Sequence, residues 1–216
     1  MFVILNFYTL ILVFSYLLGS IPFGLIISRA KGIDIRTKGS GNIGATNVFR
    51  SVGKSFGLLC FVLDFLKGLV SAWVFPVVML TDEMLQAHPS FPLLAGAFAI
   101  LGHNFPVWLK FKGGKGIATS AGVIAAVAPL SFLTAFVVWV GTMVLSRIVS
   151  LASILAAIGV AVSGWIFYSD QPVVAVILTF LGIVAVVRHR SNIQRLLKGE
   201  EHRFGKKKEE KANVER

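Results

Sequence analysis

Long apolar runs and short polar segments alternate along the chain. Five runs each come close to the ~20 residues that a helix needs to cross the hydrocarbon core of a bilayer. They cover residues 5–28, 56–80, 91–109, 150–168 and 172–188. Apolar runs of this length are typical of helices, whose backbone groups are all hydrogen-bonded internally and which can therefore span a membrane. The pattern predicts an all-α polytopic membrane protein.

A sixth apolar stretch, residues 117–145, is long for one crossing and short for two. The positions of Lys and Arg decide between the two, because cytoplasmic loops collect these residues. The polar segments 81–90 and 168–172 contain neither, whereas the last part of the chain is rich in both. A single crossing would put that basic end outside. We therefore predict two crossings with a turn near Ala128-Pro129, giving seven transmembrane helices with the N-terminus outside and the C-terminus cytoplasmic.

Composition supports this class of protein. Charged residues make up 14% of the chain, against about a quarter in a typical soluble domain. The net charge of +11 marks membrane sidedness rather than nucleic-acid binding, because no soluble basic domain is present.

The single Cys60 excludes an intrachain disulfide and a Cys-based metal site, and acidic residues are too scarce on the inner side to hold a metal. We expect no metal and no cofactor, with a membrane domain over 1–198 and a charged, disordered cytoplasmic tail over 199–216.

The first polar group lies in GSGNIGATNVFR, residues 39–50. Its glycines at 39, 41 and 44 allow positive φ and a close approach of backbone N–H groups to an anion, and Arg50 can grip phosphate oxygens in pairs. The polar members of this group are Ser40, Asn42, Thr46, Asn47 and Arg50, with Gly41 and Gly44 among the expected phosphate contacts. A glycine-rich turn with helix-capping side chains would explain the same residues.

The second group is GHNFPVWLKFKGGKGIATSAG, residues 102–122. A glycine-rich loop, a lysine and a helix N-terminus are the parts of an anion site, although the spacing of a nucleotide-hydrolysing Walker loop is absent. The expected contacts are His103, Asn104, Lys112, Gly113, Gly114, Lys115, Gly116 and Thr119. GNIGAT at 41–46 is echoed by GKGIAT at 114–119, which suggests two phosphate groups bound side by side. The alternative is that glycines and lysines only mark an inner membrane boundary.

Further polar residues lie at the same predicted face. His189 and Asn192 are three residues apart on one helical face at the end of the last span. Ser150 and Ser153 begin another span, where a lone serine is usually a cap or an interhelical bond. Asp64 and Lys67 lie within the second span, and we interpret them as a structural ion pair. The chain contains no HxxxxD or HExxH motif, so we expect the chemistry to depend on anion binding, positioning and an already activated substrate.

These segments resemble the bacterial PlsY family of membrane acyltransferases. The matching motifs are LLGSIPFG (17–24), KGSGNIGATNVFR (38–50), LDFLKG (63–68), GHNFPVWLKFKGGKGIAT (102–119), VSLASI (149–154) and RHRSNIQRLLKGEEHRF (188–204). The resemblance implies a seven-helix protein of the bacterial inner membrane whose active site faces the cytoplasm. It also implies the first acylation of phospholipid biosynthesis: transfer of a fatty acyl group from acyl phosphate to glycerol 3-phosphate, giving lysophosphatidate and phosphate. Neither acyl-CoA nor acyl carrier protein would be the direct donor.

The resemblance also implies roles for individual residues. Ser40 and Arg50 match substrate contacts, Lys115 matches the lysine of a phosphate loop, and Ser153, His189 and Asn192 match polar residues of the later motifs. An acyl phosphate is a mixed anhydride, so we expect direct attack by the 1-hydroxyl, with either His189 or the departing phosphate taking the proton. Two other classes stay open at this point: a transporter of a phosphorylated metabolite and a structural membrane subunit.

Overall fold

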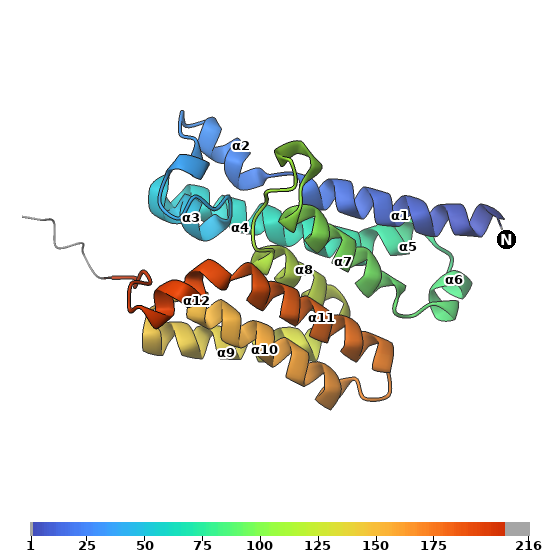
Figure 1. The fold of residues 1–216 in the computed structure, drawn as a ribbon. Helices are drawn as coiled ribbons and strands as arrows, with labels where there is room; N and C mark the ends of the chain where they lie inside the picture. Colours follow the sequence, from blue (N-terminus) through green and yellow to red (C-terminus); the bar gives the residue numbers. More distant parts are fainter. Residues whose placement is uncertain (1, 206–216) are drawn as a thin grey trace, which may run out of the picture.

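The computed structural model describes residues 2–205, and the regular elements in that range are all helices (Figure 1). The α-helices are α1 (Phe2–Ser20), α2 (Phe23–Arg29), α3 (Ala45–Ser51), α4 (Lys54–Leu69), α5 (Phe75–Met79), α6 (Asp82–Ala87), α7 (Phe91–Asn104), α8 (Ile117–Val127), α9 (Pro129–Ser146), α10 (Val149–Phe167), α11 (Pro172–Arg188) and α12 (Arg190–Leu197). Short 3-10 turns lie at η1 (Ile35–Thr37) and η3 (Val107–Leu109), and a π-helical turn, η2 (Val70–Val74), joins α4 to α5. The all-helical prediction is confirmed.

Several helices are long and apolar enough to cross a membrane. Within the described residues there are five such segments: Asn6–Arg29, Lys54–Met79, Phe91–Leu109, Pro129–Ser146 and Val149–Phe167. The pair α11 and α12, bent by 57° at their junction, raises the number to six when counted as one span. The seventh predicted crossing corresponds to α8, which has only 11 residues. The count of seven and the orientation of the termini stay predictions.

The stretch that was ambiguous in the sequence is broken at Ala128. This residue, fully buried and non-helical, separates the end of α8 from Pro129, the first residue of α9. Proline is well placed there, because a first helical residue needs no backbone N–H for an intrahelical bond. The turn that we predicted near Ala128-Pro129 is therefore present between two helices.

Small residues allow the helices to pack at close range. α1 packs on α7, α4 on α8, and α10 on both α9 and α11. A Cβ added at Gly68 would lie 2.2 Å from the carbonyl oxygen of Thr119, and one added at Gly122 would lie 1.9 Å from that of Phe65. The α4–α8 contact therefore needs both glycines, as expected of helices that associate in lipid through close backbone approach. Figure 1 shows α8 between the half that holds α1, α4 and α7 and the half that holds α9, α10 and α11.

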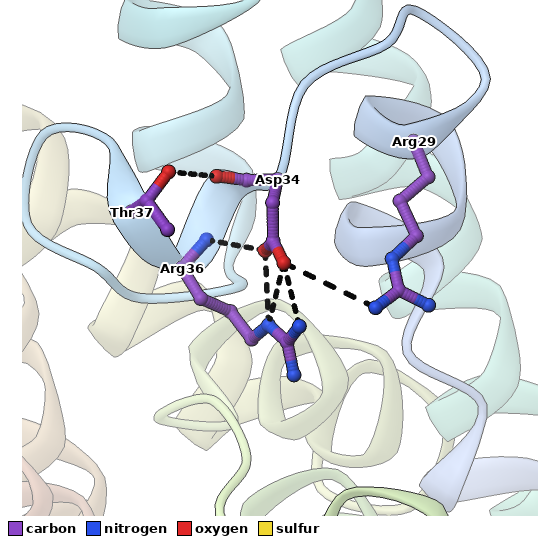
Figure 2. Close-up of polar contacts among 4 residues, drawn as sticks. All are labelled: Arg29, Asp34, Arg36 and Thr37. Carbon is purple, nitrogen blue, oxygen red and sulfur yellow. Dashed lines mark hydrogen bonds and ion pairs between the residues drawn. The ribbon is translucent and has the colours of Figure 1, made fainter.

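One end of the bundle carries most of the irregular structure. α2, α3 and α12 lie at this end in Figure 1, opposite α6 and the turn between α10 and α11. Asp34 organises the segment after α2 by accepting bonds from the Arg36 backbone N at 3.1 Å and its Nε at 2.9 Å (Figure 2). Thr37 Oγ1 donates to the Asp34 carbonyl at 2.9 Å. The hydrogen bonds from Arg36 lower the pKa of the Asp34 carboxyl to about 2.

Candidate active site

A polar cavity of about 160 Å³ opens at this same end of the bundle. Its walls come from segments that are far apart in the sequence, and all six residues that we predicted to act in catalysis line it. The predicted residues in its lining are Ser40, Asn42, Gly44, Thr46, Asn47, Arg50, His103, Lys115, Gly116, Ser153, His189 and Asn192. The fold thus brings the three polar groups of the sequence into one place.

Asn47 holds the first loop together from within. Its side chain is 2% exposed, and its Nδ2 lies 3.3, 3.0 and 2.8 Å from the carbonyl oxygens of Ile35, Lys38 and Asn42. Its Oδ1 accepts from the Ser40 backbone N at 3.1 Å. Asn47 is therefore committed to the loop backbone, and what it supplies to the cavity is shape.

The glycines of this loop divide into two kinds. Gly39 and Gly41 adopt φ of 56° and 68°, the left-handed region that favours glycine, as the sequence predicted. Gly44 does not: its φ is −76°, it precedes α3 as an extended N-cap, and the Asn42 side chain accepts from its N–H at 2.8 Å. The expectation of positive φ at Gly44 was wrong, because an asparagine turn supplies the bend there instead.

The second loop is held from outside by α7 and α11. The backbone N–H groups of Gly113 and Gly114 donate to the carbonyls of Asn104 and His103 at 3.2 and 3.1 Å. From the end of α11, Arg188 Nη2 donates to the carbonyl oxygens of Gly113 at 3.0 Å and Gly114 at 2.6 Å. The carbonyl groups of Gly113 and Gly114 therefore point towards Arg188. Lys115 and Gly116, the next two residues, line the cavity.

Lys115 is the cation that this loop presents. Its Nζ donates to Oδ1 of Asn192, which holds the ammonium group at the first turn of α12. Burial lowers the pKa of Lys115 to about 8. The positive charges of Arg50, Arg188 and Arg195 lower this pKa further, whereas the negative charge of Glu201 raises it. A group in this state gains strongly from an anionic ligand.

His189 lines the cavity and has one ring nitrogen committed to the backbone. Its Nδ1 lies 2.8 Å from the carbonyl oxygen of Ala185. A carbonyl can only accept, so Nδ1 carries the hydrogen and Nε2 of the neutral ring keeps its lone pair. The ring is 3% exposed and lies at the junction of α11 and α12. Nε2 is thus the ring nitrogen that is free to accept a proton.

Glu201 is a cavity residue that sequence reasoning missed. Its side chain is 8% exposed, and it accepts from Ser150 Oγ at 3.0 Å, Asn192 Nδ2 at 2.8 Å and Arg195 Nε at 2.7 Å. Burial disfavours its charge, but these hydrogen bonds prevail and lower the pKa of Glu201. The motif 188–204 contained this residue, and only its distance in sequence from Ser150 hid its place.

Residues 199–205 accordingly pack against the helices, whereas we had expected a disordered tail from residue 199. The Phe204 backbone N donates to the Arg147 carbonyl at 2.8 Å, and its ring lies 5.8 Å from that of Phe49, centroid to centroid. These two contacts of Phe204 and the hydrogen bond between Ser150 and Glu201 order the segment. The rest of the predicted tail, 206–216, lies outside the described residues.

Asp64 and His103 form the buried floor of the cavity. Asp64 Oδ1 lies 2.7 Å from Lys67 Nζ and 3.5 Å from His103 Nδ1. Lys67 also donates to the Ile21 carbonyl at 3.0 Å. The predicted Asp64–Lys67 ion pair is present, and it faces the cavity through its aspartate, which the sequence did not reveal.

Six predicted contacts lie outside the cavity lining: Gly41, Asn104, Lys112, Gly113, Gly114 and Thr119. Lys112 is exposed to the surroundings, whereas Asn104 and Thr119 are fully buried beneath the second loop. Gly114 supports the site by close approach, because a Cβ there would lie 2.0 Å from Nε2 of His103. Gly113 and Gly114 thus lie directly against His103, which lines the cavity.

An apolar pocket of about 360 Å³ adjoins the polar cavity. It runs between α4, α8, α9, α10 and α11 and is lined almost wholly by hydrocarbon and aromatic side chains. Phe61, Ile117, Trp139 and Ser153 line both spaces. A ligand with a polar head and an apolar chain would fit across this junction.

Among residues 2–205, no group of three or more His, Cys, Asp or Glu side chains is arranged to hold a metal ion.

Comparison with known proteins gives consistent results. A family model described as glycerol-3-phosphate acyltransferase matches residues 9–199. The glycerol-3-phosphate acyltransferase of Aquifex aeolicus is 45% identical over 195 residues, covering 90% of this chain and 97% of that protein. The enzyme of the same name from Bacillus subtilis is 44% identical over 189 residues, covering 87% and 93%.

Two crystal structures of PlsY (YgiH), an integral membrane glycerol 3-phosphate acyltransferase, share the fold. The glycerol 3-phosphate form has a TM-score of 0.81 and 43% identity, covering 92% of this chain and 96% of that chain. The lysophosphatidic acid form has a TM-score of 0.78 and 42% identity, covering 92% and 95%.

Proposed function

Because this chain belongs to the glycerol-3-phosphate acyltransferase family, and is thus an integral membrane acyltransferase, we propose that its acyl donor is a fatty acyl phosphate. The acceptor is the 1-hydroxyl of glycerol 3-phosphate. The products are 1-acyl-glycerol 3-phosphate (lysophosphatidate) and inorganic phosphate. Neither acyl-CoA nor acyl carrier protein acts as the direct donor, and no cofactor takes part.

The observation that carries this proposal is the junction of the two cavities. The polar cavity gathers Arg50 and Lys115 near the N-terminus of α8, a combination that favours phosphate. The apolar pocket has the lining that a fatty acyl chain requires. An acyl phosphate changes from polar to apolar at its carbonyl carbon, and the site changes in the same way at Ser153 and Ile117.

The reaction needs no covalent enzyme intermediate. The glycerol 1-hydroxyl oxygen attacks the carbonyl carbon, the carbon–oxygen bond to phosphate breaks, and phosphate leaves with the bonding electrons. Arg50 and Lys115 stabilise the charge on the leaving phosphate, and holding both substrates together removes much of the entropic barrier. The hydroxyl proton passes either to Nε2 of His189, whose Nδ1 is held by Ala185, or to the departing phosphate.

We place the cavity on the cytoplasmic side of the bacterial inner membrane, within a seven-span topology. The basic segments that flank it support this orientation through the positive-inside bias. The segments 81–90 and 168–172, which lack Lys and Arg, lie at the other end of the bundle. The proposal places both substrates on the side where glycerol 3-phosphate is made.

The test uses protein purified in detergent, without a sealed compartment. Palmitoyl phosphate is incubated with and without glycerol 3-phosphate, and released phosphate and lysophosphatidate are measured together. We expect both products in equal amounts and only when glycerol 3-phosphate is present, and no product when palmitoyl-CoA or palmitoyl carrier protein replaces the donor. Turnover with either of these donors, or none with palmitoyl phosphate, would overturn the proposal, and the second result would favour transport of a phosphorylated metabolite.

A histidine variant assigns the proton acceptor. If His189 takes the proton, His189→Gln lowers kcat by about 10²-fold or more, the usual contribution of a general base. If the leaving phosphate takes it, the variant keeps near-full kcat across roughly pH 6 to 8. Gln can still accept a hydrogen bond but cannot take up a proton. A loss of kcat in His189→Gln therefore indicates lost proton transfer rather than lost positioning of the substrate.

A further inference from the structure

Three tryptophans of this chain donate their indole N–H to a hydroxyl on a neighbouring segment. Trp108 donates to Ser20 at 2.8 Å, Trp165 to Thr179 at 3.0 Å and Trp139 to Ser153 at 3.2 Å. The pairs have the same donor and the same kind of acceptor. They differ in what the hydroxyl does with its own hydrogen.

In two of the pairs the hydroxyl hydrogen is already used. Ser20 Oγ donates to the Leu17 carbonyl at 2.7 Å, and Thr179 Oγ1 donates to the Ala175 carbonyl at 2.8 Å. Such bonds to the preceding turn are the usual choice of a hydroxyl in a helix. Ser153, three residues after Ser150 in α10, donates to no group within residues 2–205 and only accepts, from Trp139.

The hydroxyl of Ser153 therefore keeps one hydrogen to donate. The residue is 3% exposed and lines both the polar cavity and the apolar pocket. Trp139, on α9, lines both spaces as well. At this junction the proposed function puts the carbonyl group of the donor, whose oxygen gains negative charge during attack.

We propose that Trp139 is a positioning residue, which holds the oxygen of Ser153 so that its O–H donates to the acyl carbonyl oxygen. This inference rests on the proposed function and adds a residue that none of the motifs contains. The indole N–H occupies one lone pair of the hydroxyl and also polarises it, since hydrogen bonds in a chain strengthen one another. Trp139 itself contacts neither reacting group through its N–H.

The test compares two phenylalanine substitutions in the full-length protein. Trp139→Phe keeps an aromatic ring but removes the N–H, and we expect kcat to fall about five- to tenfold, the effect of one net hydrogen bond, with KM for glycerol 3-phosphate little changed. Trp165→Phe removes the matched bond to Thr179, and we expect wild-type kinetics. Equal losses in the two variants would overturn the proposal, because they would indicate a general effect of helix packing.

A double-mutant cycle with Ser153→Ala separates positioning from structure. If Trp139 acts through Ser153, Trp139→Phe lowers kcat in the wild-type background and has no further effect in the Ser153→Ala background. The same fold-loss in both backgrounds would contradict the proposal. Wild-type turnover is measured first, so failure of the proposed reaction is distinguished from failure of this inference.

A second replacement covers the case in which Trp139→Phe does not fold. β-(3-Benzothienyl)alanine introduced at position 139 has the same fused-ring shape as tryptophan and lacks only the N–H donor. We expect an unchanged melting temperature and the same five- to tenfold fall in kcat. Full activity of this protein would overturn the role of the N–H.

Discussion

The polar cavity and the apolar pocket share four residues but are built in different ways. The cavity walls come from loops and helix ends that are fixed by individual hydrogen bonds, such as those of Asn47 and Arg188. The pocket is formed by the faces of five helices and has almost no polar lining. Directional bonds fail when a single atom is removed, whereas apolar packing tolerates changes that preserve volume. Substitutions in the cavity should therefore cause large losses of activity. Substitutions in the pocket should cause smaller losses that depend on the length of the acyl chain of the donor.

The largest effect is expected at Lys115. Lys115→Ala removes the cation of the second loop and leaves Asn192 without its donor. We expect kcat/KM to fall by about 10³-fold or more, the scale of removing a buried stabiliser of transition-state charge. The measurement is phosphate release from palmitoyl phosphate in the presence of glycerol 3-phosphate. Activity near that of the wild type would contradict the assignment of the phosphate loop.

A smaller loss is expected from Asn47→Ala, because Asn47 shapes the first loop without acting on the substrate. The variant leaves three carbonyl groups without their shared donor, so Ser40 and Arg50 lose their fixed positions. We expect about a 10²-fold fall in kcat/KM and a lower melting temperature. Ser51→Ala, which removes only a 3.3 Å bond to the Asn47 side chain, is the control and should stay within a few-fold of the wild type.

A pH profile tests the charge of Lys115 without removing it. Burial lowers its pKa to about 8 in the free protein, so the ammonium form is present below that pH and is lost as the pH rises through it. Since kcat/KM reports the free enzyme, we expect it to fall about tenfold per pH unit above about 8. In Lys115→Arg the remaining activity should show no such break, because guanidinium stays charged. A break that persists in Lys115→Arg would assign the titration to another group.

The smallest effect is expected deep in the apolar pocket. Val160 lies seven residues after Ser153 on α10, about 10 Å along the helix, and it lines the pocket. Val160→Phe narrows the space that only a long chain reaches, so we expect a several-fold loss with palmitoyl phosphate and none with a short-chain donor. Val162, 53% exposed on the outer side of the same helix, gives the matched control Val162→Phe. Equal effects on both chain lengths would argue against this path for the acyl chain.

Sequence reasoning located the parts of the site that are local. The loops around Ser40 and Lys115 were recognisable because glycines, a cation and a helix start occur together in each. Contacts between distant segments were not, and they account for what was missed. Glu201 reaches Ser150 across 51 positions and Asp64 meets His103 from another helix. Only the folded chain brings these pairs together.

The fold was predictable for similar reasons. Apolar runs gave the helices, and Pro129 marked the break after α8. The sequence predicted the turn that ends α8, but hydropathy alone did not show whether a helix of only 11 residues crosses the membrane. The conformation of Gly44 was also not predictable from its residue type alone. Asn42, two residues earlier, forms the turn that we had expected Gly44 to form.

The short α8 has a consequence for the stability of the donor. α8 and α9 meet at Ala128, and both extend back to the cavity end, where Gly116 lies in its wall and Arg147 contacts Phe204. With 11 residues against 18, α8 is about 10 Å shorter than α9. In the proposed reaction, Lys115 lies two residues before α8 and would hold the phosphate below the end of α9. If the donor is the proposed acyl phosphate, this depth would reduce its contact with bulk water before the glycerol hydroxyl attacks, so we expect transfer to outrun hydrolysis.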